Sequence, residues 1–218
     1  MPLLPVNPEA GGTDRLRGAG LLWTVRLADG MVSGAAHTTA HTIRPAFEVI
    51  KTRPGVSVVS SVFFMGLEDR VLVYGDCAVV PNPTAEQLAQ IGYAASRIVR
   101  TLGIVPRIAM LSFSNFGSVR SEATERVARA VQLLRQRDPS LVVDGEMQAD
   151  TAMDAGILET MFPFSQLGTE PANVLIFPNL SAGNIAYKLL DHLGGATAIG
   201  PILVGMRRPV HVLEQGAD

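Results

Sequence analysis

The alternation of short apolar runs with helical patterns constrains the fold of this chain more than any other feature of its sequence. From about residue 28 onward, β-rich runs such as residues 56–65, 107–113 and 173–177 are separated by segments whose apolar residues recur at helical spacing. Strands that alternate with helices are joined by βαβ crossovers, which make the strands parallel. The sequence therefore predicts an α/β fold with a mainly parallel sheet and helices on both faces.

Local signals place the first of these elements. Residues 56–65 and 70–74 are rich in β-branched and aromatic residues and flank a turn, so they predict a hairpin or two adjacent strands. Thr84, with Gln87 three residues later, forms the capping-box pattern of a helix start, and Gly103 is placed to end that helix. Further strands are predicted at 107–113, 141–144, 173–177 and 199–204, and further helices around 127–134 and over 148–158 and 181–193.

Composition and charge exclude several classes of protein. The formal net charge is −2, so there is no basic excess to neutralise a nucleic-acid backbone. A single cysteine, Cys77, excludes an intramolecular disulfide and a multi-cysteine zinc site, and it fits a reducing compartment. No apolar run approaches the roughly 18 residues of a membrane span. We therefore expect a cytoplasmic protein that binds neither nucleic acid nor membrane.

The first 26 residues differ in composition from the rest of the chain. They are rich in proline and glycine and lack the apolar core of a signal peptide. We interpret residues 1–26 as a loose or atypical leader and residues 27–218 as the folded domain.

Small polar residues gather where the predicted strands end, which is where parallel sheets bind ligands. The segments concerned are 75–84, 112–118, 144–150 and 178–184. Segment 112–118, SFSNFGS, offers hydroxyls, an amide and a glycine ahead of a helix N-terminus, which suits a phosphate cradle. An ordinary β–α turn with an N-cap serine explains it equally well. It is not a P-loop, because the Gly-Lys-Ser/Thr ending is absent.

Segment 144–150, DGEMQAD, places three carboxylates close together after a predicted strand. Alternation along an extended segment points several of them into one cleft, as acid–base or metal chemistry requires. No histidine stands beside them, which disfavours a metal site. Helix capping and compensation of a helix dipole are the alternative explanation.

Residues 37–45 contain two histidines and an arginine. His37 and His41 lie four residues apart, but no glutamate lies between them as in the HExxH pattern, so zinc is not favoured. The hydroxyls and Arg44 instead suit an anion pocket, because arginine offers phosphate a bidentate fork. A capped helix start with a solvated Arg44 is the alternative.

We interpret Cys77 as a buried residue and not a nucleophile, because its neighbour Asp76 disfavours a thiolate.

Seven blocks of this sequence, in order from about residue 27 to residue 216, resemble successive blocks of the phosphate acetyltransferase family. They are HTTAHTIRPAFEVIKT, VSSVFFM, YGDCAVVPNPTAEQLAQI, AMLSFSNFGS, DGEMQADTA, ANVLIFPNLSAGNIAYKLL and AIGPILVGMRRPV. The blocks are also similar to the homologous C-terminal domain of multidomain NADP-dependent malic enzymes. The resemblance implies two α/β subdomains flanking a cleft, an architecture like that of isocitrate and isopropylmalate dehydrogenases, and a homodimer.

The resemblance also implies a reaction and its substrates. The reaction is acetyl-CoA + phosphate = CoA + acetyl phosphate, in which the CoA thiol attacks acetyl phosphate directly. Coenzyme A and acetyl-CoA are then substrates, with no covalently bound cofactor and no metal. The malic-enzyme likeness implies an alternative, a regulatory domain that binds acetyl-CoA with weak or absent turnover.

Site residues follow from the same blocks. Arg44 matches the family's phosphate-binding arginine. The substrate- and CoA-binding positions are predicted to be Thr38, Thr39, Ser112, Ser114, Asn115, Gly117, Asp144, Asn179, Gly183 and Asn184.

The chain departs from the family pattern near its end. Glu214 and Gln215 stand where family members carry the catalytic Ser-Arg pair of a Ser-Arg-Gly motif. A carboxylate in place of a hydroxyl, near phosphate and oxyanion charge, opposes the reaction electrostatically. By comparison with the family pattern, we also expect an incomplete first subdomain and no C-terminal helix.

Overall fold

The computed structural model describes residues 29–34 and 39–213, which form two compact units. The larger unit is the continuous segment Ser60–Ile199, and the smaller unit combines the chain before and after it. Strand β7 (Thr197–Val204) therefore begins in the larger unit and ends in the smaller one. The predicted leader, residues 1–26, lies outside the described residues.

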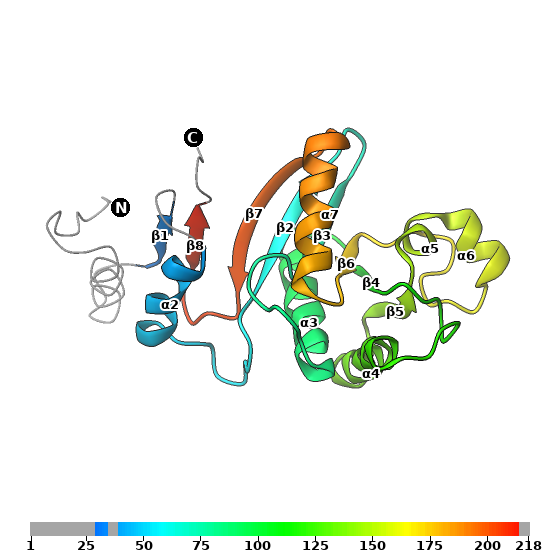
Figure 1. The fold of residues 1–218 in the computed structure, drawn as a ribbon, viewed down its shortest axis with the longest axis horizontal. Coiled ribbons are helices and arrows are strands. Elements are labelled where there is room, and N and C mark those ends of the chain that lie inside the picture. The colour runs from blue at the N-terminus through cyan, green and yellow to red at the C-terminus, as the bar shows by residue number, and fades with distance from the viewer. Residues whose placement is uncertain (1–28, 35–38, 214–218) are drawn as a thin grey trace, which may run out of the picture. The chain divides into compact units, whose positions relative to one another are not determined.

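Five neighbouring strands of the larger unit follow the order β2-β3-β6-β4-β5 (Figure 1). They are β2 (Ser60–Gly66), β3 (Val71–Gly75), β4 (Arg107–Leu111), β5 (Val142–Met147) and β6 (Val174–Ile176). Strands β3, β6, β4 and β5 run parallel, and β2 runs antiparallel to β3. This arrangement confirms the predicted α/β fold with a mainly parallel sheet.

Helices cover both faces of these strands. The helices of this unit are α3 (Ala85–Thr101), α4 (Glu122–Arg137), α5 (Ala149–Met153), α6 (Ala155–Met161) and α7 (Leu180–Leu193). Because side chains alternate between the faces of a strand, Met110 and Ile176 lie beside Gly92 of α3 on one face. On the other face Phe63 stacks on Tyr187 of α7, with ring centroids 4.3 Å apart. That second face also receives the buried side chains of α5 and α6.

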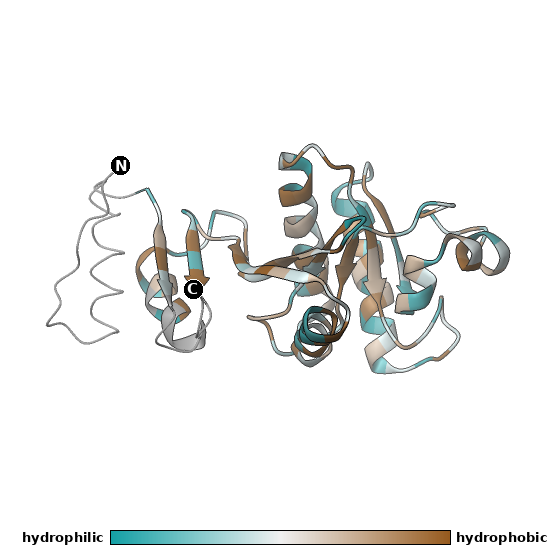
Figure 2. Ribbon diagram, turned by 90° about the horizontal axis from the view of Figure 1, so that it is seen from above, coloured by the Kyte–Doolittle hydropathy of each residue, from teal (hydrophilic) through white to brown (hydrophobic). Residues whose placement is uncertain are grey.

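Burial of apolar side chains between these layers stabilises the unit. Ile108, Met110, Ile176, Phe63 and Met65 are at most 1% exposed. Each buried side chain of this size contributes roughly 1.5–3 kcal/mol relative to exposure to water. Figure 2 shows strongly apolar colours along the strands and mixed colours along the helices, as expected when strands are covered on both faces.

Most of the predicted element boundaries are confirmed. The β2–β3 hairpin closes with the Leu67 N–H donating to the Arg70 carbonyl at 2.8 Å. Thr84 and Gln87 form the reciprocal capping box of α3. The positive φ of 75° at Gly103 follows the end of that helix, as glycine permits.

The single helix predicted over 148–158 is wrong, because the chain divides it into α5 and α6. Asp154 ends α5 and is the N-cap of α6, where its Oδ1 accepts from the N–H groups of Gly156 (2.7 Å) and Ile157 (3.1 Å). An aspartate competes for backbone N–H groups and favours such caps over a helix interior.

The strand predicted at 141–144 is longer than expected. β5 continues to Met147, whose carbonyl accepts from the Ser112 N–H at 2.8 Å. Asp144 and Glu146 therefore lie in a strand, and of the three carboxylates only Asp150 lies in the first turn of a helix, α5. The helix-capping explanation is thus wrong for the first two carboxylates.

The smaller unit has its own strands. β1 (Met31–Gly34) pairs parallel with β8 (Val210–Leu213), and β7 pairs antiparallel with β8. Helix α2 (Thr39–Val49) packs against β1 and β8. The buried stripe at the helix and just after it consists of Ile43, Ala46 and Ile50. In the part of the chain that the structure describes, no helix has both the length and the apolar character needed to cross a membrane.

Candidate functional site

The carboxyl ends of four parallel strands meet at one edge of the larger unit. β3, β6, β4 and β5 are parallel neighbours, so the segments that follow them emerge on the same side. We call this the carboxyl edge. Segments 112–118 and 178–184 follow β4 and β6 there, segment 75–84 follows β3, and residues 144–150 run through the end of β5.

Many backbone N–H groups of the 112–118 loop are bonded within the protein. Each N–H group from residue 115 to residue 119 donates to a protein acceptor. In chain order the acceptors are Ser118 Oγ (3.0 Å), the Glu146 carbonyl (2.8 Å), Glu146 Oε1 (2.6 Å), the Asn115 carbonyl (2.9 Å) and Ser114 Oγ (3.0 Å). A phosphate cradle needs N–H groups that point at the ligand, so this loop offers an anion fewer donors than its sequence suggests.

A buried carboxylate, Glu146, holds this loop. Its side chain is 3% exposed, and Oε1 accepts from Ser114 Oγ at 3.0 Å as well as from the Gly117 N–H. Gly117 has a φ of 84°, a conformation that glycine adopts without the strain of a side chain. Charge-assisted bonds of this length are about twice as strong as neutral ones. The sequence placed Glu146 in a cluster of carboxylates but gave no sign that it bonds to the loop after β4.

Paired amides connect the same loop to the end of β5. Asn115 Nδ2 donates to Gln148 Oε1 at 3.0 Å, and the Gln148 N–H donates to Asn115 Oδ1 at 2.7 Å. Gln148 Nε2 also donates to the Phe113 carbonyl at 2.8 Å. The structure therefore brings the predicted residues Ser114, Asn115 and Gly117 together around β5, and half-buried Ser112 begins the loop. Their roles in binding remain predictions.

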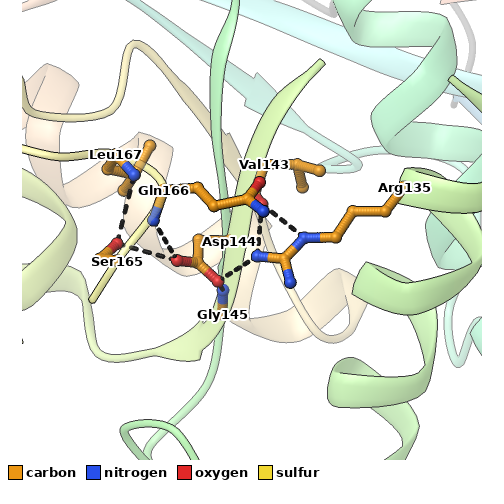
Figure 3. A network of polar contacts seen from close by, with 7 residues as sticks. All are labelled: Arg135, Val143, Asp144, Gly145, Ser165, Gln166 and Leu167. Atoms are coloured by element: carbon orange, nitrogen blue, oxygen red, sulfur yellow. Dashed lines mark hydrogen bonds and ion pairs between the residues drawn. The ribbon is translucent and has the colours of Figure 1, made fainter. Parts of the chain in front are cut away.

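Asp144 is the centre of a polar network (Figure 3). Its Oδ1 contacts Arg135 Nη2 at 2.6 Å and accepts from the Gly145 N–H at 3.0 Å. Its Oδ2 accepts from Ser165 Oγ at 2.9 Å and from the Gln166 N–H at 2.7 Å. The network ties α4, β5 and the segment after α6 together. The prediction that Asp144 contacts substrate stays a prediction.

A second buried carboxylate organises the segment after β3. Asp76 is 3% exposed and accepts from Ser61 Oγ and from the N–H groups of Ser61, Ala78, Val79 and Val80. Burial raises the pKa of Asp76, and the hydrogen bonds from Ser61 and the loop oppose that shift. The adjacent Cys77 is fully buried, as predicted, and burial together with the Asp76 charge raises the pKa of its thiol.

Three predicted residues lie in the 178–184 segment, and two of them, Gly183 and Asn184, contact this loop. Asn179 is the N-cap of α7, and its Oδ1 accepts from the Ala182 N–H at 2.9 Å. Gly183 packs so closely that a Cβ atom there would lie 2.6 Å from the Asp76 carbonyl oxygen. Asn184 Nδ2 donates to the Cys77 carbonyl at 3.2 Å. These contacts position both segments at the carboxyl edge.

Arg126 is a charged residue at this edge that the sequence reasoning missed. It lies on α4, and its Nη2 approaches the Pro178 carbonyl at 3.5 Å, the long limit of a hydrogen bond. Among the residues that the structure describes, its Nε is the one buried side-chain nitrogen or oxygen without a hydrogen-bond partner. No sequence signal distinguished Arg126 from the other arginines of this helix.

The remaining predicted residues belong to the smaller unit. Arg44 lies on the exposed side of α2, and its Nε contacts Glu48 Oε1 at 3.8 Å. Thr39 is the first residue of α2, and its side chain is not among those described. Thr38, Glu214 and Gln215 lie outside the described residues. Within residues 29–34 and 39–213, no three histidine, cysteine, aspartate or glutamate side chains gather as metal ligands would.

Comparison with solved structures defines the class of fold first. The chain is similar to a putative 4-hydroxythreonine-4-phosphate dehydrogenase from Salmonella typhimurium with a TM-score of 0.54 at 14% identity, over 94% of this chain and 61% of that one. This likeness shows the fold alone. A phosphotransacetylase from Streptococcus pyogenes gives a TM-score of 0.90 at 41% identity, over 94% of this chain and 63% of that one.

Sequence comparison then gives the family. The phosphate acetyltransferase of Nitratidesulfovibrio vulgaris is 53% identical over 87% of this chain and 27% of its own length. That of Corynebacterium glutamicum is 50% identical over 87% of this chain and 57% of its own length. The family model for phosphate acetyl/butaryl transferases matches residues 12–218, so the chain belongs to this family and the predicted resemblance is confirmed. The chain thus spans well under two thirds of these two relatives.

Proposed function

We propose that this chain catalyses acetyl transfer between CoA and phosphate, acetyl-CoA + phosphate = CoA + acetyl phosphate. The observation that carries the proposal is the 53% identity to a protein named phosphate acetyltransferase, together with the match to the family over residues 12–218. The substrates are CoA, acetyl-CoA, phosphate and acetyl phosphate, and no covalently bound cofactor is required. We place the reaction in the acetate metabolism of the cytoplasm.

The chemistry is a direct acyl transfer. The sulfur of CoA forms a bond to the acetyl carbonyl carbon, the bond from that carbon to the phosphate oxygen breaks, and phosphate leaves. The thiol proton passes to a base or to water. Catalysis of this kind depends on holding two anionic substrates in register and on stabilising the charge that develops on the carbonyl oxygen. Fixed loops such as those at the carboxyl edge suit that task.

Arg44 is proposed to hold phosphate. The Arg44 side chain is 84% exposed, and its contact with Glu48 is 3.8 Å long. An exposed ion pair of this type stabilises a protein by little. An anion that binds its donors in pairs therefore competes with Glu48 at small cost.

A coupled assay tests the activity. Acetyl phosphate and CoA are added to the purified chain, and the absorbance of the thioester is followed. We expect turnover, and we expect Arg44→Ala to lower kcat/KM at least tenfold. The control is Arg70→Ala in the β2–β3 turn, which removes another exposed arginine paired with a carboxylate, Asp69, and should change kcat/KM less than twofold. Absence of turnover would contradict the proposal.

A second function is favoured by one observation. By the family resemblance, Glu214 and Gln215 stand where a Ser-Arg pair is expected, and this favours a regulatory domain that binds acetyl-CoA without turnover. In that case acetyl-CoA raises the melting temperature, because ligands that bind only the folded state stabilise it. The coupled assay then shows no turnover.

The double substitution Glu214→Ser with Gln215→Arg separates the two functions. Removing one donor from an oxyanion site costs about 10²–10³ in rate. We therefore expect the double variant to turn over at least tenfold faster than the natural chain. Unchanged or lower activity would show that these two positions do not limit the reaction.

The homodimer implied by the family resemblance is also proposed. Helix α7 carries an apolar stripe of Ile185, Leu189 and Leu193, which are 58%, 53% and 81% exposed. A stripe at this spacing suits packing against the same helix of a second copy. Light scattering on the natural chain and on Leu189→Lys tests this: we expect a dimer and a monomer respectively, and a monomeric natural chain would contradict the proposal.

A further inference from the structure

The Nε of Arg126 is a buried donor without an acceptor. Buried polar groups in folded proteins almost always have a hydrogen-bond partner, so an exception calls for an explanation. In the part of the chain that the structure describes, Arg126 Nε is the one side-chain exception. Among the described residues, the remaining donors of its guanidinium have a single, long contact, with the Pro178 carbonyl at 3.5 Å. A partly buried positive charge with so little compensation is costly to the ligand-free protein.

Arg126 lies where a substrate of this fold is expected. It belongs to the N-terminal half of α4, the helix that follows the loop after β4, so it lies near the carboxyl edge. Its neighbour Pro178 immediately precedes Asn179, the N-cap of α7. The N-terminus of this 14-residue helix adds partial positive charge to that of the guanidinium. We call Arg126 with residues 178–184 the Arg126 corner.

The rest of the carboxyl edge offers fewer free hydrogen-bond donors to an anion. In the 112–118 loop and at residue 119 just after it, the N–H groups of residues 115 to 119 already have protein acceptors, and one acceptor is the carboxylate of Glu146. In the loop after β3, the carboxylate of Asp76 accepts hydrogen bonds from the N–H groups of Ala78, Val79 and Val80. Both carboxylates repel a second anion. The guanidinium of Arg126 is therefore a donor group of this edge with capacity left.

We propose that Arg126 binds the phosphate group of a substrate at the carboxyl edge of the larger unit. This inference rests on the proposed function for the identity of the substrate. A guanidinium presents donors in a planar fork that matches two oxygens of one phosphate. The phosphate group belongs either to acetyl phosphate and inorganic phosphate or to CoA.

The test measures phosphate binding by calorimetric titration of the full 218-residue chain with inorganic phosphate, with and without the substitution Arg126→Met. Methionine keeps the length and apolar stem of the side chain but removes the charge. We expect the dissociation constant to rise at least tenfold. The matched control is Arg129→Met, which removes an exposed arginine of the same helix and should change the constant less than twofold. Equal affinity for both inorganic phosphate and CoA in Arg126→Met and in the natural chain would overturn the proposal.

A parallel titration with CoA identifies the source of the phosphate. Loss of phosphate affinity alone assigns Arg126 to acetyl phosphate and inorganic phosphate, and loss of CoA affinity alone assigns it to a phosphate of CoA. Either result supports the proposal. If Arg129→Met weakened ligand binding as much as Arg126→Met does, the proposal would be overturned, because general electrostatic attraction would then explain both losses of affinity.

Thermal melting adds a readout that does not depend on activity. Because Arg126→Met removes an unpartnered buried donor, we expect the ligand-free variant to melt about 2 °C higher or more, while phosphate no longer raises its melting temperature. Arg126→Lys, which keeps the charge and loses the fork, should bind phosphate with intermediate affinity. A variant that melts lower and keeps the phosphate response would show that Arg126 serves the fold.

The proposed function and this inference fail separately. A chain that binds phosphate through Arg126 and shows no acetyl transfer retains this inference and loses the proposed activity. A chain that transfers acetyl groups, and whose Arg126→Met variant keeps full affinity for both phosphate and CoA, retains the activity and loses this inference.

Discussion

The 112–118 loop and the Arg126 corner lie at the same edge of one sheet, but their hydrogen-bond donors differ in availability. The loop has the sequence expected of an anion cradle, and its N–H groups donate to Glu146, Asn115 and the loop's own serines. The corner contains an arginine in the N-terminal half of a helix, and its buried Nε has no acceptor among the described residues. A segment rich in small polar residues can thus be satisfied by its own fold, while an inconspicuous helical residue keeps donors for a ligand.

The largest expected effect is on the unfolding free energy, when the polar network around Asp144 is broken. Asp144→Ala removes the acceptor of Arg135, of Ser165 and of the Gln166 N–H. Breaking a buried charge network in this way costs about 3 kcal/mol of unfolding free energy. Urea denaturation measures it, with Asp150→Ala as the control because that aspartate is exposed in the first turn of α5. Equal losses in the two variants would show that the network adds no stability.

A smaller effect is expected where the loop meets Glu146. Glu146→Ala leaves the Ser114 hydroxyl and the Gly117 N–H without their acceptor, at a cost of about 2 kcal/mol. Glu146→Gln retains an acceptor oxygen without the charge and should lose about half as much. Hydrogen exchange of the Gly117 N–H reports the opening of the loop. If the Gly117 N–H stayed protected from exchange in Glu146→Ala, the loop's donors would not depend on Glu146, and the contrast with the free donor of Arg126 would be lost.

The same position also tests whether charge limits anion binding at the loop. Glu146→Gln removes a negative charge while an oxygen still accepts from the loop. We expect inorganic phosphate to bind severalfold more tightly to this variant than to the natural chain. Titration at constant ionic strength checks this, and a weaker affinity would show that Glu146 helps to bind the ligand.

The smallest effect is expected at the contact between α7 and the β3 loop. Gly183→Ala places a Cβ atom 2.6 Å from the Asp76 carbonyl oxygen and 3.0 Å from Cys77 Sγ, so the two segments must separate. Overpacking of this kind costs about 1–2 kcal/mol. Alkylation of Cys77, the single cysteine and a buried one, should be faster in the variant. Unchanged alkylation and melting would show that the backbone adapts without cost.

The sequence predicted the frame of the fold because local signals and apolar periodicity agree there. The capping box at Thr84 and Gln87 and the strand pattern of β6 depend on neighbours along the chain, and both were predicted. The interruption at Asp154 was missed because the flanking apolar spacing is continuous, and only the geometry of the turn shows that its carboxylate caps a new helix.

The candidate site was less accessible to sequence reasoning. The resemblance named Ser114, Asn115 and Gly117, which do lie together, but it could not show that Glu146 takes up the loop's donors. Arg126 was missed for a related reason. Whether a helical arginine has an acceptor depends on a residue far away in the sequence, here Pro178, and no spacing rule reports that distance.

The smaller unit is formed by two parts of the chain that are separated by the whole of the larger unit. Met31 of β1 pairs with Val210 of β8, and residues 60–199 lie between them in the sequence. During synthesis the larger unit is complete before β8 leaves the ribosome, because the chain emerges from its N-terminus. Closing the β1–β8 pair then costs the entropy of joining distant ends, and a larger unit that is already folded shortens the loop that must be ordered. The order of synthesis thus makes the smaller unit fold after the larger one.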